Sequence, residues 1–291
     1  GDYYVVTTEL ADATAEINFN GTTAQTASGI IEGASAGVGI LDVDNDVTFL
    51  GVIGTDGMAN IEIADGKTAT FRGATVASTA ITLQGASDSS SIVFGGHAGN
   101  STTAFTGNIV ATGVGGVLTL TGDDTDAVGH TVTGSIAATG TANYLATINV
   151  GNDNAEGATT TDVHTATINV FADTLAFSAT DDAGTTTTGG TFKSTCASTC
   201  TTTLGAVTTA VDGDGTLHYV NAAVNTGSVT GSIGTSSAGL KEVIMDASAA
   251  ALNLDAGGNI YATTLTMDGA GNANLTVSGT TASTVSSAIV A

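Results

Sequence analysis

Short segments in which two apolar residues flank one intervening residue recur along the whole chain. Each is followed closely by Gly, Asp or Asn, which favour turns. Such period-2 alternation is typical of strands that bury one face, whereas helical periodicity does not extend beyond a turn or two. The sequence therefore predicts an all-β protein with many short strands. The alternating segments are Ile61–Ile63, Ile81–Leu83, Ile92–Phe94, Leu118–Leu120, Ile148–Val150, Ile168–Val170, Leu252–Leu254, Leu265–Met267 and Leu275–Val277.

Similar segments return at regular intervals. The pentapeptide Ala-Thr-Ile-Asn-Val occurs at 146–150 and again at 166–170, and the same interval separates Ile61 from Ile81. Degenerate repeats of this length indicate successive coils of a solenoid. We therefore expect a β-solenoid, or β-helix, of irregular coils of roughly 20 residues each.

A further pair of similar segments, 107–113 and 134–140, is separated by a longer interval, so the coils differ in length. The absence of proline fits a solenoid, because central strands need every backbone N–H for pairing. Tandem β-sandwiches are the alternative, since they also contain many short strands. Sandwich cores favour large aromatic residues, and this chain has eight Phe, five Tyr and no Trp. No linker stands out, so we expect one elongated domain over residues 1–291.

Acidic residues far outnumber basic ones: 27 Asp and Glu against four Lys and Arg give a net charge of −23. A phosphate backbone and an anionic membrane surface would both repel such a chain, so we expect neither as a partner. No continuous run of 18 apolar residues occurs, and we expect no membrane insertion. The first residue is Gly1 rather than Met, which favours a secreted protein, extracellular or at the cell surface, whose leader has been removed.

The sequence resembles those of bacterial β-helical surface proteins in its short alternating segments rich in Gly, Thr and Asn, such as Gly107–Gly113, Leu118–Gly122 and Ala146–Val150. These proteins are autotransporter passenger domains, large adhesins and β-rich S-layer subunits. The resemblance covers most of the chain. It implies an extracellular structural or adhesive role, often with assembly into arrays, and it brings no catalytic residues to this sequence.

Clustered carboxylates mark several predicted turns. Asp42, Asp44 and Asp46 alternate along the chain, and closely spaced Asp side chains supply the oxygen ligands that calcium prefers. The helix-loop-helix calcium motif does not fit, because Ile53 stands where its bidentate Glu belongs. We expect either bound calcium or solvated corners that keep the rod soluble. The candidate calcium ligands are Asp42, Asp44, Asp46, Asp123, Asp124, Asp126, Asp212 and Asp214.

The two cysteines, Cys196 and Cys200, lie close together in the sequence. No other cysteine or nearby histidine completes a four-ligand zinc site. We expect a small local disulfide between them that holds one turn in place, with two buried free thiols as the alternative.

The sequence offers no convincing catalytic set. Ser35 sits in a Gly-Ala-Ser-Ala-Gly match to the nucleophile elbow, but a strand-like run follows it where that motif requires a helix. The histidines are scattered, and no two have the spacing typical of metal ligands, so we expect them at the surface or at corners. We therefore expect that the protein is not an enzyme. The histidines are His97, His130, His164 and His218.

These features together favour a structural subunit that packs with copies of itself into an S-layer, filament or tubular appendage. Solenoids leave unpaired strand edges at both ends, which monomers must cap. Residues 280–291 carry no charged side chain, and residues 1–10 also read as a strand, so we expect both ends to contact neighbouring subunits. The alternatives are an adhesin segment that binds a surface or glycan ligand, a polysaccharide-active β-helix enzyme and an ice-binding protein.

Overall fold

The computed structural model shows a β-solenoid whose described residues form 25 strands and no helix. Within the described ranges, nothing forms a helix long and apolar enough to cross a membrane. The structure describes residues 1–85, 90–95, 104–113, 115–121, 129–137, 144–151, 162–177, 189–196, 199–221, 225–247, 251–279 and 282–291.

The strands are short, as the alternating segments predict. They are β1 (Tyr3–Leu10), β2 (Glu16–Phe19), β3 (Gln25–Gly33), β4 (Ile40–Val43), β5 (Val47–Phe49), β6 (Ile53–Met58), β7 (Asn60–Ile63), β8 (Thr68–Phe71), β9 (Thr75–Leu83), β10 (Ser91–Phe94), β11 (Ala104–Ala111), β12 (Val117–Leu120), β13 (Thr131–Thr133), β14 (Leu145–Val150), β15 (Val163–Ala166), β16 (Val170–Phe177), β17 (Thr191–Cys196), β18 (Cys200–Thr209), β19 (Asp214–Asn221), β20 (Asn225–Val229), β21 (Leu240–Asp246), β22 (Leu252–Ala256), β23 (Ile260–Asp268), β24 (Ala273–Val277) and β25 (Val285–Val290).

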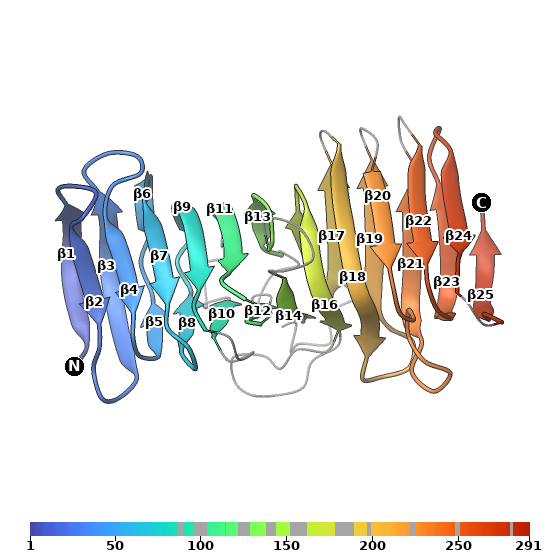
Figure 1. The fold of residues 1–291 in the computed structure, drawn as a ribbon, viewed down its shortest axis with the longest axis horizontal. Helices are drawn as coiled ribbons and strands as arrows, with labels where there is room; N and C mark the ends of the chain where they lie inside the picture. The colour runs from blue at the N-terminus through green and yellow to red at the C-terminus, as the bar shows by residue number, and fades with distance from the viewer. Residues whose placement is uncertain are drawn as a thin grey trace.

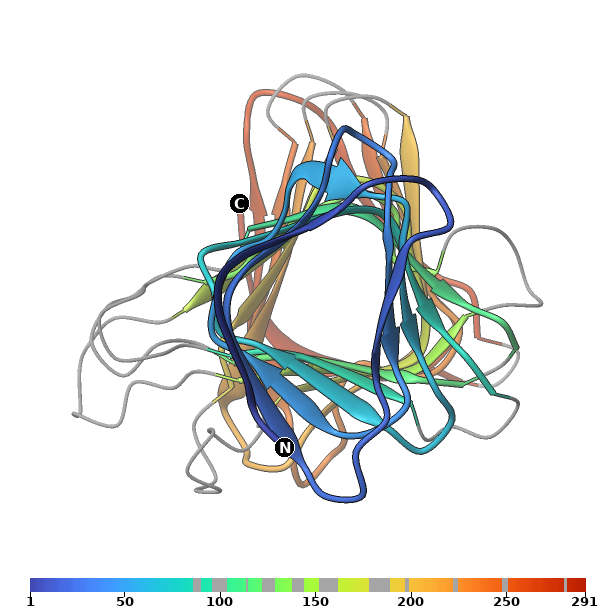
Figure 2. The ribbon, with the colours of Figure 1, turned by 90° about the vertical axis from the view of Figure 1, so that its left-hand side faces the viewer.

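Every pairing between the named strands of the described residues is parallel and joins successive coils, for example β5 with β8 and β8 with β10. Figure 1 shows the strands side by side along the long axis, with the two termini at opposite ends. Seen down this axis, the coils enclose a roughly three-sided cross-section (Figure 2). The first face includes β5, β8, β10, β12 and β14, the second includes β13, β15, β17, β19 and β21, and the third includes β2, β4, β7, β22 and β24.

The predicted repeats correspond to stacked coils in two of three cases. Ile61 pairs with Ile81, and Ile109 pairs with Ile136, as the similar segments predict. The interval from Ile136 to its partner Val170 on the next coil is longer than either of these. The solenoid is therefore irregular in coil length.

The repeated pentapeptide does not mark one coil. Ile148 of its first copy is buried and pairs with Leu118 and Leu175. Ile168 of its second copy is exposed and lies before β16 begins at Val170. The prediction of a strand over Ile168–Val170 is wrong at its first two residues, because the pairing of the coils and not the local sequence decides which positions face inward.

Aromatic rings stack along the axis in the N-terminal half of the core. Phe49, Phe71 and Phe94 are ladder partners on successive coils, and all three are fully buried. The ring centroids of Phe49 and Phe71 are 5.2 Å apart with an interplanar angle of 14°, and those of Phe71 and Phe94 are 5.7 Å apart. Offset stacking at such distances adds to the hydrophobic gain from burial. Phe49, Phe71 and Phe94 therefore form one continuous column through three successive coils.

Glycine occupies a corner where the backbones of successive coils approach closely. A Cβ atom at Gly51 would lie 1.8 Å from the carbonyl oxygen of Gly29, and one at Gly73 would lie 2.1 Å from that of Gly51. No larger residue fits such an approach without a shift of the backbone. The glycines of this corner are thus explained by the stacking of the coils.

Candidate functional site: the two open ends

The C-terminal end of the solenoid leaves one edge of each last strand without a partner among the described residues. β24 pairs with β22, and β25 pairs with β23; their outer edges face away from the rod. An exposed strand edge presents a row of backbone N–H and C=O groups that can pair with another chain.

Inward-facing side chains at this end are exposed because none of the described coils covers them. Ile289 continues the column of Leu265, which is fully buried, yet the side chain of Ile289 is 64% exposed. Val285 is 39% exposed, whereas its partner Ile260 is fully buried. The last described coil therefore presents an apolar surface that a further coil or a second copy could cover.

The N-terminal end is also open, although an aromatic residue covers part of it. β1 pairs with β3, and β2 with β4, so their other edges are free within the described chain. The Tyr3 ring packs edge-on against Phe19 with centroids 5.8 Å apart, and its hydroxyl forms a 2.6 Å hydrogen bond with Oγ1 of Thr8. Ile17 continues the fully buried column of Leu41 but is only half-buried.

The two ends match in layout. β1 and β25 each run along the first face and turn the corner onto the second, while β2 and β24 both lie on the third face. At each end of the solenoid, the last two strands therefore contribute to all three faces. A second copy placed with β1 on β25 and β2 on β24 would extend every ladder in the parallel sense.

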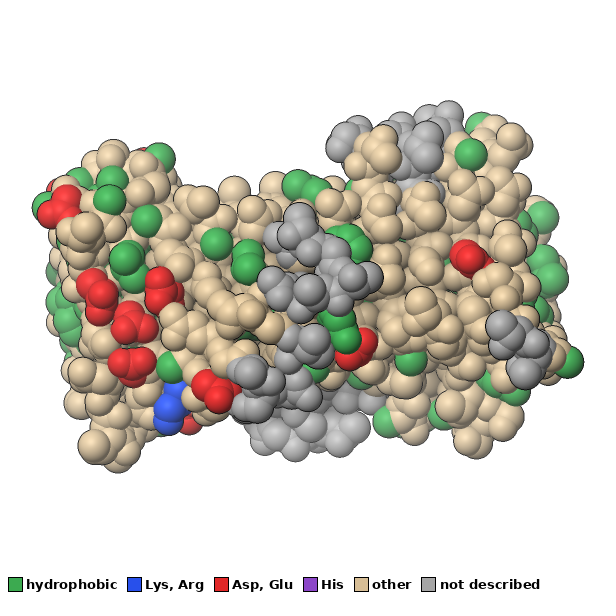
Figure 3. Space-filling model, viewed as in Figure 1, with side chains coloured by type: hydrophobic (Ala, Val, Ile, Leu, Met, Phe, Trp, Pro, Cys, Tyr) green, Lys and Arg blue, Asp and Glu red, His purple; other side chains and the backbone are tan. Residues whose placement is uncertain are grey.

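Acidic side chains gather on the third face near the N-terminal end, where Figure 3 shows a red cluster. Asn18 donates through Nδ2 to carboxylate oxygens of Asp42 at 2.8 Å and Asp44 at 3.0 Å. Partial burial raises the pKa of Asp42, and the neighbouring charges of Asp44, Glu16 and Glu62 add to the effect. The structure thus brings two predicted calcium ligands together and adds Glu16 and Glu62, which the sequence analysis missed.

The other predicted calcium ligands within the described residues accept hydrogen bonds from backbone N–H groups. The Asp46 carboxylate accepts a hydrogen bond from the backbone N–H of Thr68 at 2.9 Å. In the same way, Asp212 accepts from the backbone N–H of Gly239, and Asp214 accepts from the backbone N–H of Gly189. Asp123, Asp124 and Asp126 lie outside the described residues. In the part of the chain that the structure describes, no group of three or more His, Cys, Asp or Glu residues has the geometry to hold a metal ion.

The remaining predicted site residues lie elsewhere. Cys200 begins β18 and is disulfide-bonded, whereas the side chain of Cys196 is outside the described part, so their pairing stays a prediction. Ser35 lies in an exposed turn between β3 and β4, with a strand after it. His97 is outside the described ranges.

Two histidines are buried: His130 lies directly before β13, and His164 lies within β15. The prediction of positions at the surface or at corners is therefore wrong for His164. The rings of His130 and His164 stack with centroids 5.3 Å apart, and His130 lies 6.2 Å from the ring of Phe94. The backbone N–H of His130 donates to Nδ1 of His164, so the proton of His164 is on Nε2, which donates to the carbonyl of Gly151 at 2.8 Å. The pair extends the aromatic column.

Acid is expected to destabilise the fold through His164. Burial, followed by the adjacent His130, lowers the pKa of His164 from 6.5 to about 3. Between these values the unfolded chain binds a proton that the folded chain does not, so stability is lost as the pH falls below 6.5. The loss is about 2–3 kcal/mol by pH 4.5, at about 1.4 kcal/mol per pH unit.

Urea unfolding at pH 7.0 and 4.5 checks this expectation. His164→Phe should lose most of the dependence on pH, whereas His218→Gln, which alters a half-buried histidine outside the aromatic column, should lose less. Equal pH dependence in the wild type and in His164→Phe would contradict the assignment.

Comparison with known proteins finds no matching family model, no matching curated protein and no matching solved structure.

Proposed function

We propose that the protein is a structural subunit that stacks end to end with copies of itself to form an extracellular filament or a related surface assembly. The observation that carries the proposal is the pair of open, matching ends, each with free strand edges and inward-facing apolar side chains that water reaches. Pairing of β25 with β1 of the next copy would cover both the edges and the apolar surface.

The contact would be of the head-to-tail kind. Because every ladder is parallel, the C-terminal end of one copy meets the N-terminal end of the next, and two identical ends do not pair in this way. Head-to-tail contacts that do not close into a ring generate filaments. An end-to-end stack of copies therefore lengthens along one axis, and nothing in the contact limits the number of copies.

Charge would oppose the assembly. Each copy carries a net charge of −23, and the N-terminal end carries Asp2 and Glu9 on β1 or beside it, while β25 has no charged side chain. Repulsion between copies falls as salt shortens the Debye length from about 30 Å at 0.01 M to about 3 Å at 1 M. We therefore expect polymers to form more readily at high ionic strength.

Light scattering after size-exclusion chromatography, together with negative-stain electron microscopy, tests the proposal. The chain should be monomeric at low salt and low concentration and should form rods of increasing length as salt and concentration rise. Deletion of residues 280–291 should abolish the rods while the circular dichroism spectrum keeps its β-sheet signal. A full-length chain that stays monomeric under all these conditions would overturn the proposal.

Calcium is expected to stabilise the fold at the acidic cluster of Asp42, Asp44, Glu16 and Glu62. Among the described residues these carboxylates do not form a ready-made metal site. A divalent cation that gathers near them would still offset part of their mutual repulsion, and at ten times its Kd the linkage gives about 1.4 kcal/mol. Thermal melts with calcium and with chelator should differ, and Asp42→Asn should reduce the difference more than Asp56→Asn, which alters an exposed carboxylate on β6. Melts that coincide would show that these carboxylates are only solvated.

A further inference from the structure

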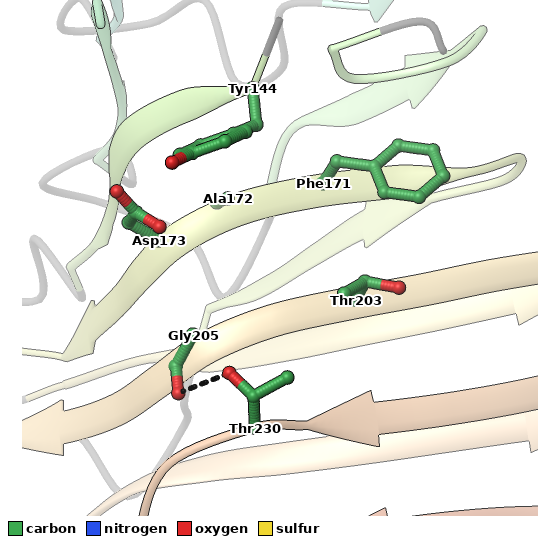
Figure 4. Close-up of a pocket in the computed structure, with 7 residues that line it drawn as sticks. All are labelled: Tyr144, Phe171, Ala172, Asp173, Thr203, Gly205 and Thr230. Carbon is green, nitrogen blue, oxygen red and sulfur yellow. Dashed lines mark hydrogen bonds between the residues drawn. The ribbon is translucent and has the colours of Figure 1, made fainter. Parts of the chain in front are cut away.

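A groove follows the corner between the third and first faces in the C-terminal half of the solenoid. Two hollows of about 310 and 330 Å³ lie along this corner and share Thr230 as a lining residue. Tyr144, Phe171, Asp173, Thr203 and Gly205 also line the first hollow (Figure 4), and Ser228, Asp255 and Ser278 line the second.

Strand register joins the hollows into one line. Phe171 pairs with Thr203, Thr203 with Ser228 and Ser228 with Asp255, so these residues form a column with one member per coil. Tyr144 is next to Leu145, the partner of Ala172, and so begins the column one coil before Phe171. At about 4.8 Å per coil, the four steps from Tyr144 to Asp255 span roughly 19 Å parallel to the axis.

One end of the groove is aromatic. Seven of the eight phenylalanines are buried in the core, and Phe171 is the exception: it points outward between the inward-facing Val170 and Ala172. Tyr144 is also half-buried, and its ring lines the same hollow (Figure 4). Two partly exposed rings on adjacent coils form an apolar platform that can cover the C–H face of a flat ligand ring.

The rest of the groove offers hydrogen-bonding groups. The hydroxyl of Thr230 donates to the carbonyl oxygen of Gly205 at 3.3 Å, which leaves its lone pairs available to a ligand. Asp173 is exposed at the first hollow, and Oδ1 of Asp255 at the second is buried with no hydrogen-bond partner in the described structure. A buried acceptor without a donor is costly, and a donor from a ligand or water would satisfy it.

The floor of the groove stays open because its corner requires glycine. A Cβ atom at Gly205 would lie 2.3 Å from the carbonyl oxygen of Asp173, and one at Gly257 would lie 2.3 Å from that of Thr230. Neither position can therefore carry a side chain that would fill the hollow.

We propose that this groove binds a neutral polysaccharide in an extended form. Sugar rings would stack on Tyr144 and Phe171, and sugar hydroxyls would donate to Asp173, Asp255 and the Thr and Ser oxygens along the corner. No Lys, Arg or His lines either hollow, and the chain has a net charge of −23. Acidic glycans would therefore be repelled. The groove lies on the side of the rod and reaches the last coil at Ser278, which directly follows β24.

Isothermal titration calorimetry tests the proposal with four neutral hexasaccharides, namely cellohexaose, maltohexaose, mannohexaose and N-acetylchitohexaose, and with hexagalacturonate as the acidic comparison. At least one neutral hexasaccharide should bind saturably, and more tightly than its disaccharide, because the groove spans several coils. Hexagalacturonate should not bind. Phe171→Ser and Tyr144→Ser should each weaken binding at least tenfold, and Asp173→Asn should weaken it less.

Tyr261→Ser, which alters a partly exposed tyrosine outside the groove, is the matched control and should leave binding unchanged. Circular dichroism of each variant confirms that the fold is kept. The proposal is overturned if none of the neutral hexasaccharides binds, if hexagalacturonate binds as tightly, or if Phe171→Ser and Tyr144→Ser both bind like the wild type.

Discussion

Replacement of Ile289 by Lys is expected to abolish end-to-end polymers. The Ile289 side chain continues the buried column of Leu265 but is exposed at the open end, so a second copy would cover it. A lysine there would place an unpaired charge in the contact, which costs several kcal/mol. The concentration needed for assembly should rise at least about 100-fold, since each 1.4 kcal/mol is a factor of ten.

Val211→Lys is the control for this variant. Val211 is a similarly exposed aliphatic residue, at 54%, but it lies in a turn on the side of the rod. The control changes charge and hydrophobicity equally and leaves the end untouched. If Ile289→Lys assembles like the wild type, or if Val211→Lys loses assembly to the same degree, the end of the core is not the contact.

Phe71→Ala is expected to destabilise the fold by about 3–5 kcal/mol, the usual cost of removing a fully buried phenylalanine. Phe71 stacks between Phe49 and Phe94, so its removal would leave a gap in the aromatic column. Solenoid coils contact mainly their neighbours, and the damage should therefore be concentrated in the coils of β5, β8 and β10. Urea unfolding followed by hydrogen exchange measures both the loss and its location.

Phe171→Ala supplies a matched comparison, because it makes the same chemical change at an outward-facing position. Phe171 is half-buried and packs against the core from outside, so we expect its replacement to cost about 1–2 kcal/mol, clearly less than that of Phe71. If the two variants are equally stable, or if exchange rises evenly over the chain in Phe71→Ala, the aromatic column is not the core of the N-terminal half.

Local alternation was enough to predict the fold class but not the direction of every side chain. In β15, for example, Val163 is 39% exposed, whereas His164 is fully buried. His164 faces inward because β15 pairs with β13 and β17, where Phe192 is its ladder partner. Contacts between residues on different coils, far apart in the sequence, decide this, and no local pattern reports them.

The two candidate sites also differ in whether the sequence alone predicts them. The ends could be recognised in the sequence, because an uncharged strand-like run at 280–291 is a local property. The groove could not, because Tyr144, Phe171, Thr203 and Asp255 come together only through the register of successive coils. The coils also differ in length, so such columns do not follow any fixed repeat in the sequence.

Electron cryomicroscopy of the polymers tests the end-to-end stack most directly. If copies continue one another's ladders, the strand spacing of about 4.8 Å lies along the polymer axis, and the Fourier transform shows a meridional reflection at that spacing. The subunit repeat along the axis should equal the length of one rod. A reflection at about 4.8 Å perpendicular to the polymer axis, or subunits joined through their sides, would contradict the account.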